Sequence, residues 1–451
     1  MGVPGMRSQR VLVAAVAALI ALAGCSDDGQ SSTTSVDKGS TSTAGSTVDS
    51  STTVVETSSP AESTTPAAAR AWDDPVKTGA ATGEPLKIGF SNLEGGAISL
   101  PEVRYGAEAA VKLINEKRNG VGGRPIELVP CAVDASPESS VDCANKFVEA
   151  GVQAVELGVD PSADAMLPIL SDAGIPVFGH AAFGPQQRQD PNVVLFGVSA
   201  PAAGLGPLQY FAEQGAKSVV YFLADTPSSR DFTDSVLDPS AKSLGLKFKV
   251  IYYSATAADW SVLAATAMSE NPDVIGSPSA SEVDCLSMIP AVQTAGHKGP
   301  IFAAACSLFS TILGPAAVGV LTYSDLWSPT DPNTPADRQA EVAMYKDAMK
   351  AIDQSQFAEK DSFALGWFAD TMNFARILTE DGGGDLSGSA ILKTLKSTKN
   401  FEGFLGPVIS CDGSAWKGET ACGNQLLLFK TTESGVRNAV TDKFIVVSPQ
   451  G

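Results

Sequence analysis

Histidine is nearly absent from this sequence: only His180 and His297 occur among 451 residues. No Cys-x-x-Cys pair accompanies them, so a zinc site is not expected. Catalysis by a serine–histidine pair would depend on one of these two histidines, and neither lies in a recognisable motif. The chain also lacks a Gly-x-Ser-x-Gly elbow, a His-Glu-x-x-His motif and a phosphate-binding P-loop. We therefore expect no metal, no cofactor and no enzymatic activity.

Positive charge and long apolar runs are scarce as well. The formal net charge is −19, and such an acidic surface repels phosphate groups, so no nucleic-acid partner is expected. The apolar run over residues 11–23 is shorter than the roughly 20 residues that a membrane-spanning helix needs. Arg7 and Arg10 precede this run, and this order is typical of a secretory signal peptide.

The apolar run ends in Leu-Ala-Gly-Cys, which resembles the bacterial lipobox, in which the cysteine is lipidated and becomes the new N-terminus. The resemblance implies that Cys25 anchors the chain to the outer face of the cytoplasmic membrane. An ordinary cleaved signal with an unrelated cysteine is the alternative. Residues 26–69 are mostly Ser and Thr without an aromatic residue, which favours a flexible tether. We assign residues 1–24 to a signal peptide and residues 25–71 to the lipidated cysteine and its tether.

Six further cysteines follow Cys25. An even number of cysteines in an exported protein indicates disulfides, and six cysteines allow 15 connectivities. We favour sequential pairs because their members lie close together in the chain. These pairs are Cys131 with Cys143, Cys285 with Cys306, and Cys411 with Cys422.

From residue 86 onward, short apolar or β-branched segments alternate with helical patterns. Strands are expected over 86–91, 126–131, 152–157, 175–179 and 192–198, and then over 216–224, 246–253, 272–277, 299–305, 404–410 and 425–430. Helices are expected over 101–115, 137–150, 162–174, 230–243, 260–268, 282–294, 335–352, 362–380 and 387–396. This alternation predicts an α/β fold of two doubly wound parallel-sheet lobes.

Several stretches resemble the leucine/isoleucine/valine-binding type of substrate-binding proteins of ABC transporters, which have the type I periplasmic-binding fold. The stretches follow one another in the order found in that family. They include LKIGFSNLEGG, VQAVELGVDPSADAMLPILSDAGIPVF and AVQTAGHKGPIFAA, within about residues 86–429. The resemblance implies two lobes joined by three crossings, near Ser199–Pro201, Thr322–Ser328 and Phe401–Gly406. Lobe 1 would comprise residues 86–200 plus 327–402, and lobe 2 residues 201–325 plus 403–450.

The resemblance places ligand contacts in the loops after the strands of lobe 1, because open parallel sheets bind ligands outside the carboxyl ends of their strands. Glu94 and Gly95 stand where the family has a Thr-Gly pair, and Leu100 stands at an aromatic position. Ser162 matches a serine that holds a ligand carboxylate at a helix start, where free N–H groups favour an anion. The alternatives are a solvated loop acid for Glu94 and a helix N-cap for Ser162.

After the fourth strand, the resemblance makes Ala181 a small-residue contact and places Phe183 where the family has a threonine. His180 could add a hydrogen bond, but a lone histidine in a loop is more often incidental. In lobe 2, Ser228 takes the place of a stacking tyrosine, and the next contact falls at Ser277.

One family feature is absent. The family has a glutamate that binds a ligand ammonium, and its position corresponds to about Ala305 and Cys306 in this sequence, where no glutamate stands. Either Glu94 replaces that glutamate, or the ligand is not an ordinary amino acid. The expected solute is a small polar or aromatic molecule, namely an amino acid, an amide or a carboxylate.

For the chain as a whole, the resemblance implies a monomeric, lipid-anchored protein that captures a solute between its lobes and delivers it to the permease of an ABC importer. A ligand sensor of the same fold that acts on a signalling partner is the alternative.

Overall fold

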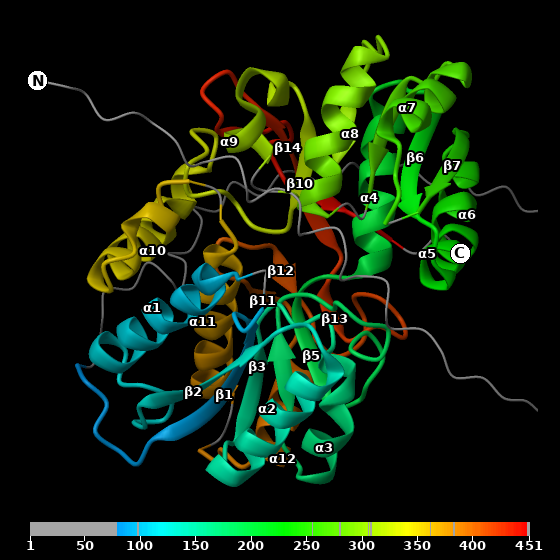
Figure 1. The fold of residues 1–451 in the computed structure, drawn as a ribbon. Helices are drawn as coiled ribbons and strands as arrows, with labels where there is room; N and C mark the ends of the chain where they lie inside the picture. The colour runs from blue at the N-terminus through cyan, green and yellow to red at the C-terminus, as the bar shows by residue number, and fades with distance from the viewer. Residues whose placement is uncertain are drawn as a thin grey trace, which may run out of the picture.

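The computed structural model describes residues 79–448, apart from residues 97–98, 255, 279–280, 305, 307–308, 361 and 382–383. The expected signal peptide, Cys25 and the tether lie outside these ranges. Within the described ranges, no helix combines the length and the apolar character that a membrane crossing requires. Two sheets with their own helices form two lobes, drawn one above the other in Figure 1. The α/β fold of two parallel-sheet lobes expected from the sequence is confirmed.

Lobe 1, the lower lobe in Figure 1, is built on a sheet of parallel strands. Its strand order is β13 (Ala421–Gly423), β5 (Val193–Val198), β4 (Val177–Gly179), β3 (Ala154–Leu157), β1 (Leu86–Leu93) and β2 (Ile126–Val133). Its helices are α1 (Pro101–Lys117), α2 (Pro137–Ala150), α3 (Leu167–Asp172), α10 (Gln339–Ala351), α11 (Ala364–Asp381) and α12 (Gly388–Ser397). Because helices cover both faces, β1 and β3 are buried along almost their whole length.

Lobe 2 is built on a mixed sheet. Its order is β15 (Arg437–Ala439), β14 (Gln425–Thr431), β10 (Leu321–Ser324), β9 (Ile301–Ala303), β8 (Val274–Ser277), β6 (Ser218–Ala224) and β7 (Lys247–Tyr253), and β16 (Ile445–Val446) pairs with β14. Strands β6 to β10 are parallel, whereas β14 runs antiparallel to β10. The helices are α4 (Ala200–Glu213), α5 (Pro227–Phe232), α6 (Asp238–Ser243), α7 (Trp260–Ser269), α8 (Glu282–Thr294) and α9 (Phe309–Leu313).

Helix α11 forms the centre of the lobe 1 core. Phe374 on α11 stacks on Phe178 of β4 with ring centroids 4.1 Å apart, and both side chains are buried. Helix α1 packs beside α11 through small residues, and an added Cβ at Gly106 would lie 2.0 Å from the carbonyl oxygen of Ala364. This close packing fixes the start of α11, which faces the space between the lobes (Figure 1).

Two of the expected helices are divided in the structure. The expected helix 162–174 consists of a short 3₁₀ turn, η2 (Ala163–Ala165), followed by α3, and the expected helix 230–243 lies across α5, the π-helical η3 (Thr233–Leu237) and α6. In both cases a proline, Pro168 or Pro239, occupies the first turn of the final segment. Proline has no N–H to donate, so each segment begins anew at that point.

Helix α4 was not expected from the sequence pattern. Ser199 caps it, and its hydroxyl accepts a hydrogen bond from the N–H of Ala202 at 3.3 Å, with Pro201 in the first turn. Gly204, Gly206 and Pro207 lie inside the helix and interrupt its apolar periodicity. Gly204 and Gly206 let α4 approach lobe 2 so closely that an added Cβ at either position would clash with lobe 2 side chains. This tertiary packing stabilises α4.

The third crossing between the lobes differs from its expected place. Strand β13 pairs in parallel with β5, so the segment that contains β13 belongs to the sheet of lobe 1, and the chain enters lobe 2 only at Asn424, between β13 and β14. The expected strand 404–410 is mostly a tight turn between β11 (Phe401–Glu402) and β12 (Val408–Ile409). Leu405 takes a positive φ of 49° in this turn, which a continuous strand would not allow. Strand β13 has only three residues, too few to produce a periodic signal.

The three disulfides are the sequential pairs that the sequence favoured. Cys131–Cys143 ties β2 to α2, Cys285–Cys306 ties α8 to the loop after β9, and Cys411–Cys422 ties the segment after β12 to β13.

The double variant Cys131→Ala, Cys143→Ala is expected to lower the free energy of unfolding by about 3 kcal/mol. The pair closes a loop across a sequence separation of 12, and removing the link restores chain entropy to the unfolded state. Urea denaturation of the variant and of the wild type, both in a non-reducing buffer that keeps the other two disulfides intact, measures the difference. An unchanged midpoint would contradict this role for the disulfide.

Candidate functional site

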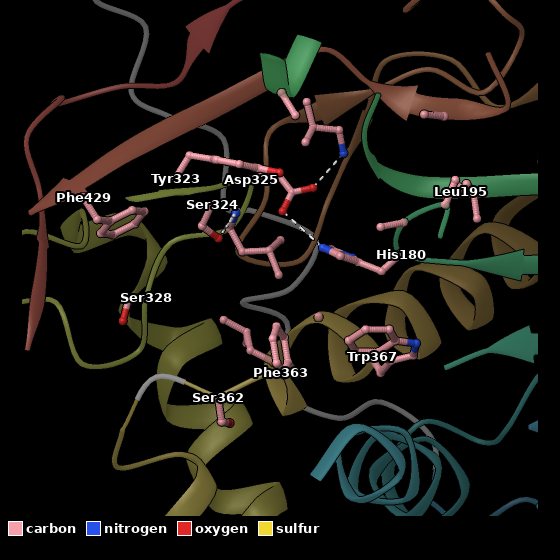
Figure 2. A pocket seen from close by; sticks show the side chains of 18 of the residues that line it. His180, Leu195, Tyr323, Ser324, Asp325, Ser328, Ser362, Phe363, Trp367 and Phe429 are labelled. Atoms are coloured by element: carbon pink, nitrogen blue, oxygen red, sulfur yellow. Dashed lines mark hydrogen bonds and ion pairs between the residues drawn. The ribbon is translucent and has the colours of Figure 1, made fainter. Parts of the chain in front are cut away.

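A cavity of about 280 Å³ lies between the lobes, beside the segments that cross from one to the other. The loop after β4 and the end of β5 form its lobe 1 wall, and the segment after β10 forms the opposite wall. In parallel sheets these strand ends lie along one edge, where the backbone leaves the sheet and side chains are free to face a ligand. Figure 2 shows the labelled lining residues His180, Leu195, Tyr323, Ser324, Asp325, Ser328, Ser362, Phe363, Trp367 and Phe429.

Trp367, on the first turn of α11, is the largest side chain on the floor of the cavity. Its indole N–H donates to the carbonyl oxygen of Leu157 at 2.6 Å, and the residue is only 3% exposed. Its ring centroid lies 5.8 Å from that of His180. Phe363 and Phe429 add apolar surface, and the hydroxyls of Ser324, Ser328 and Ser362 lie among the rings (Figure 2). The cavity therefore suits a solute with an apolar body and a small number of polar groups.

His180 lies between two carboxylates. Its Nε2 is 3.2 Å from Oδ1 of Asp325, and its Nδ1 is 3.2 Å from Oδ1 of Asp370. Burial favours the neutral imidazole, but the two carboxylates outweigh burial and hold the pKa of His180 well above its usual value. The two flanking carboxylates therefore favour the imidazolium form of the side chain. His180 is thus not isolated in its loop, because Asp325 and Asp370, far away in the sequence, supply both of its partners.

A buried acid lies behind the histidine. Glu156 on β3 is fully buried and accepts hydrogen bonds from the hydroxyl of Thr371 at 2.9 and 3.0 Å. Burial and, secondarily, the charge of Asp370 raise the pKa of Glu156 well above its usual value. Burial also raises the pKa of Asp370, although the charge of His180 opposes that effect. Burial thus favours the neutral form of Glu156, and His180 is the group that favours the charged form of Asp370.

Basic side chains outnumber carboxylates on the cavity wall. Arg188 pairs with Glu419, its Nε lying 3.1 Å from Oε2, while Arg437 and Lys360 face the cavity from β15 and from the segment before α11. His180 adds a further positive charge beside Asp325. In a chain whose net charge is −19, this local excess of positive charge favours an anionic group on the solute.

Of the ligand contacts expected from the sequence, the structure brings Ala181 and Phe183 to this cavity, and Phe183 keeps 41% of its surface exposed. Five others lie elsewhere along the strand edges and do not line it: Glu94, Gly95, Leu100, Ser162 and Ser277. Ser228 belongs to α5, and its side chain is not among those that the structure describes.

Three of the residues that do not line the cavity are buried or make polar contacts within the protein instead. Glu94 forms an ion pair with Arg104, with Oε2 lying 3.0 Å from the guanidinium, so its charge is compensated inside the protein. The hydroxyl of Ser162 donates to the carbonyl oxygen of Ala135 at 2.6 Å. Ser277 ends β8 and is buried.

The sequence pattern missed Asp325 and Trp367 as site residues. Asp325 falls inside the crossing expected at 322–328, and Trp367 falls inside the helix expected at 362–380. The signal that could have indicated Asp325 as a site residue was the presence of an acidic side chain in an expected crossing segment. No local signal distinguishes Trp367 from a core aromatic residue, because only the packing of α11 against α1 brings it to the cavity.

A family model described as periplasmic binding protein matches residues 85–418, from the start of β1 to the segment before β13. The chain belongs to the periplasmic binding protein family. No curated protein matches the chain. Within the described part of this family member, no group of three or more His, Cys, Asp or Glu side chains is arranged to hold a metal ion.

Solved structures of other periplasmic binding proteins share the fold. A leucine-binding protein from Thermotoga maritima is 19% identical, with a TM-score of 0.63 over 80% of this chain and 99% of that one. A fatty acid ABC transporter substrate-binding protein from Thermomonospora curvata is 16% identical, with a TM-score of 0.64 over 82% and 95%. An ABC transporter substrate-binding protein from Desulfitobacterium hafniense in complex with Leu is 20% identical, with a TM-score of 0.62 over 79% and 100%. These likenesses show the type I periplasmic-binding fold, as the sequence resemblance implied.

Proposed function

We propose that this periplasmic binding protein captures a small carboxylate with an apolar or aromatic body between its lobes and delivers it to the permease of an ABC importer. The observation that carries the proposal is the interlobe cavity, lined by residues of both lobes and of the segments between them. Its volume of about 280 Å³ lies just below the range for small-molecule sites, roughly 300–1,000 Å³, which suits a small solute.

The class of solute follows from the lining. Trp367, Phe363 and Phe429 offer ring surfaces for an apolar body, and the basic side chains on the wall favour a carboxylate. Glu94, the expected acceptor for a ligand ammonium, is already paired with Arg104. An amino acid would therefore have to bury its ammonium without that acceptor, at a cost of roughly 1–3 kcal/mol.

The remaining expected contacts are proposed for a closed form of the protein. Glu94, Gly95, Leu100 and Ser162 follow strands β1 and β3. In lobe 2, Ser228 follows β6 and Ser277 ends β8. Hinge closure about the crossing segments would bring such strand ends toward one another. Lipidation at Cys25 would keep the protein near its permease at high effective concentration.

A thermal-shift panel on the full chain tests this function. It contains phenylacetate and branched aliphatic carboxylates, the matched amide phenylacetamide, urea, leucine, valine and other amino acids. A compound at 1,000 times its dissociation constant adds about 4 kcal/mol to the free energy of unfolding, which raises the melting temperature by several degrees.

We expect carboxylates to raise the melting temperature and their amides to do so far less. A shift with leucine or valine alone would overturn the proposed solute class but keep the solute-binding role. If no compound in the panel shifts the melting temperature, solute capture loses its support and a role in sensing a different ligand gains weight.

A further inference from the structure

The ion pairs of His180 join elements that the chain uses to pass between the lobes. Asp325 follows β10 on the second crossing segment, and Asp370 lies on α11 of lobe 1. His180 lies directly after β4 and keeps 18% of its side chain exposed, so it touches both carboxylates and the cavity. Figure 2 shows Asp325 and His180 pointing toward one another, with Trp367 close by.

Asp325 also contacts the last residue of β5, directly before the first crossing. Its Oδ2 accepts a hydrogen bond from the backbone N–H of Val198, at the end of β5, at 2.8 Å. Gly197 permits this approach, because an added Cβ there would lie 2.8 Å from Oδ2 of Asp325 and 2.4 Å from the carbonyl oxygen of His180. One carboxylate therefore connects the second crossing segment to His180 and to the end of β5, where the first crossing begins.

We propose that His180 is a positioning residue for the solute cavity: its paired contacts with Asp325 and Asp370 hold the second crossing segment against lobe 1 in the arrangement that forms the cavity, so the lobes loosen when the imidazolium loses its proton. The proposal rests on the proposed solute-binding function and names a form of regulation for the same site.

The groups around His180 determine the direction of the pH response. Asp325 faces it from the second crossing segment and Asp370 from α11, while Glu156 of β3 lies beyond Asp370 and Tyr323 of β10 lies near Asp325. Burial acts to raise the pKa of Asp325, but the charge of His180 and the hydrogen bond from the Val198 N–H outweigh burial, so the pKa is lowered. The pKa of His180 is raised, so its contribution to stability is complete below the usual histidine value and is lost as the pH rises through the raised value.

The titration of His180 is measurable by NMR on the full chain labelled with ¹⁵N-histidine, because the chain has only two histidines. His297 is an internal control of opposite sign, since burial lowers its pKa. We expect His180 to titrate well above pH 6.5 and His297 below it. Asp325→Asn should lower the midpoint of His180 by at least one pH unit and leave His297 unchanged. A midpoint for His180 at or below 6.5, or one unaffected by Asp325→Asn, would overturn the proposal.

The arrangement of the lobes is measured without solute, by small-angle X-ray scattering. Raising the pH through the His180 midpoint should increase the radius of gyration of the wild type. His180→Gln should have the larger radius already at pH 7 and show no such transition, whereas His297→Gln should behave as the wild type. Equal radii for His180→Gln and the wild type across this pH range would overturn the proposal. If His180→Gln fails to fold, the wild-type transition and Asp325→Asn decide the question. Failure of the solute panel would leave these ligand-free results intact, so the two proposals fail separately.

Discussion

Trp367→Ala is expected to lower the free energy of unfolding by about 3–5 kcal/mol and to remove solute binding. The side chain is almost completely buried, so its loss leaves a void beside β3, and the carbonyl oxygen of Leu157 loses the donor 2.6 Å away. On the cavity side, the substitution removes the ring against which the solute is proposed to lie. Chemical denaturation measures the first effect, and calorimetric titration with the best compound of the panel measures the second.

Two matched variants separate packing from binding at this position. Trp367→Phe keeps an aromatic ring but removes the indole N–H, so we expect a loss of about 1 kcal/mol with binding largely retained. Trp260→Ala removes a tryptophan that packs on Phe222 and Tyr253 in lobe 2, away from the cavity, so it should lower stability and leave affinity unchanged. Unimpaired solute binding by Trp367→Ala would contradict the assignment of this cavity as the solute site.

Glu156→Gln is expected to raise stability at neutral pH and to flatten the dependence of stability on pH. Glu156 retains its proton in the folded state at pH values where the unfolded chain has lost it, because burial and Asp370 raise its pKa. Stability therefore falls as the pH rises from the usual glutamate value to the raised one, by about 1.4 kcal/mol per pH unit. Glutamine keeps the hydrogen bond with Thr371 and has no proton to lose, so this slope should disappear.

Urea denaturation at pH 5, 6, 7 and 8 measures the slope. The exposed Glu116, paired with Lys112 on α1, provides a control, since Glu116→Gln should leave the pH dependence unchanged. The contribution of His180 has the same sign but begins only above the usual histidine value. Asp160, whose pKa burial raises to about 6, contributes to both proteins, so the difference between Glu156→Gln and the wild type from pH 5 to 6 reports Glu156. Parallel stability curves for Glu156→Gln and the wild type would contradict the assignment of a protonated, buried glutamic acid.

Local patterns predicted the elements that depend on local burial. Strands β1, β2 and β5 and helices α2 and α8 lie where the apolar pattern placed them, because the apolar residues that mark each one lie within its own short segment. Helix α4 and strand β13 were missed because their stability depends on neighbours rather than on their own pattern: α4 packs its glycines against lobe 2, and three residues of β13 pair with β5. The third crossing was misplaced for the same reason.

The sequence by itself determined the two-lobed α/β architecture and the sequential disulfide pairing, because strand and helix periodicity and the proximity of cysteines are properties of short segments. Only the tertiary structure decided the chemistry of the candidate site. His180 lies 145 residues from Asp325 and 190 residues from Asp370, and no periodicity links such distant positions. Their contact exists because the ends of β4 and β10 and one face of α11 meet where the lobes join, and burial there makes the charge on each group depend on the other two.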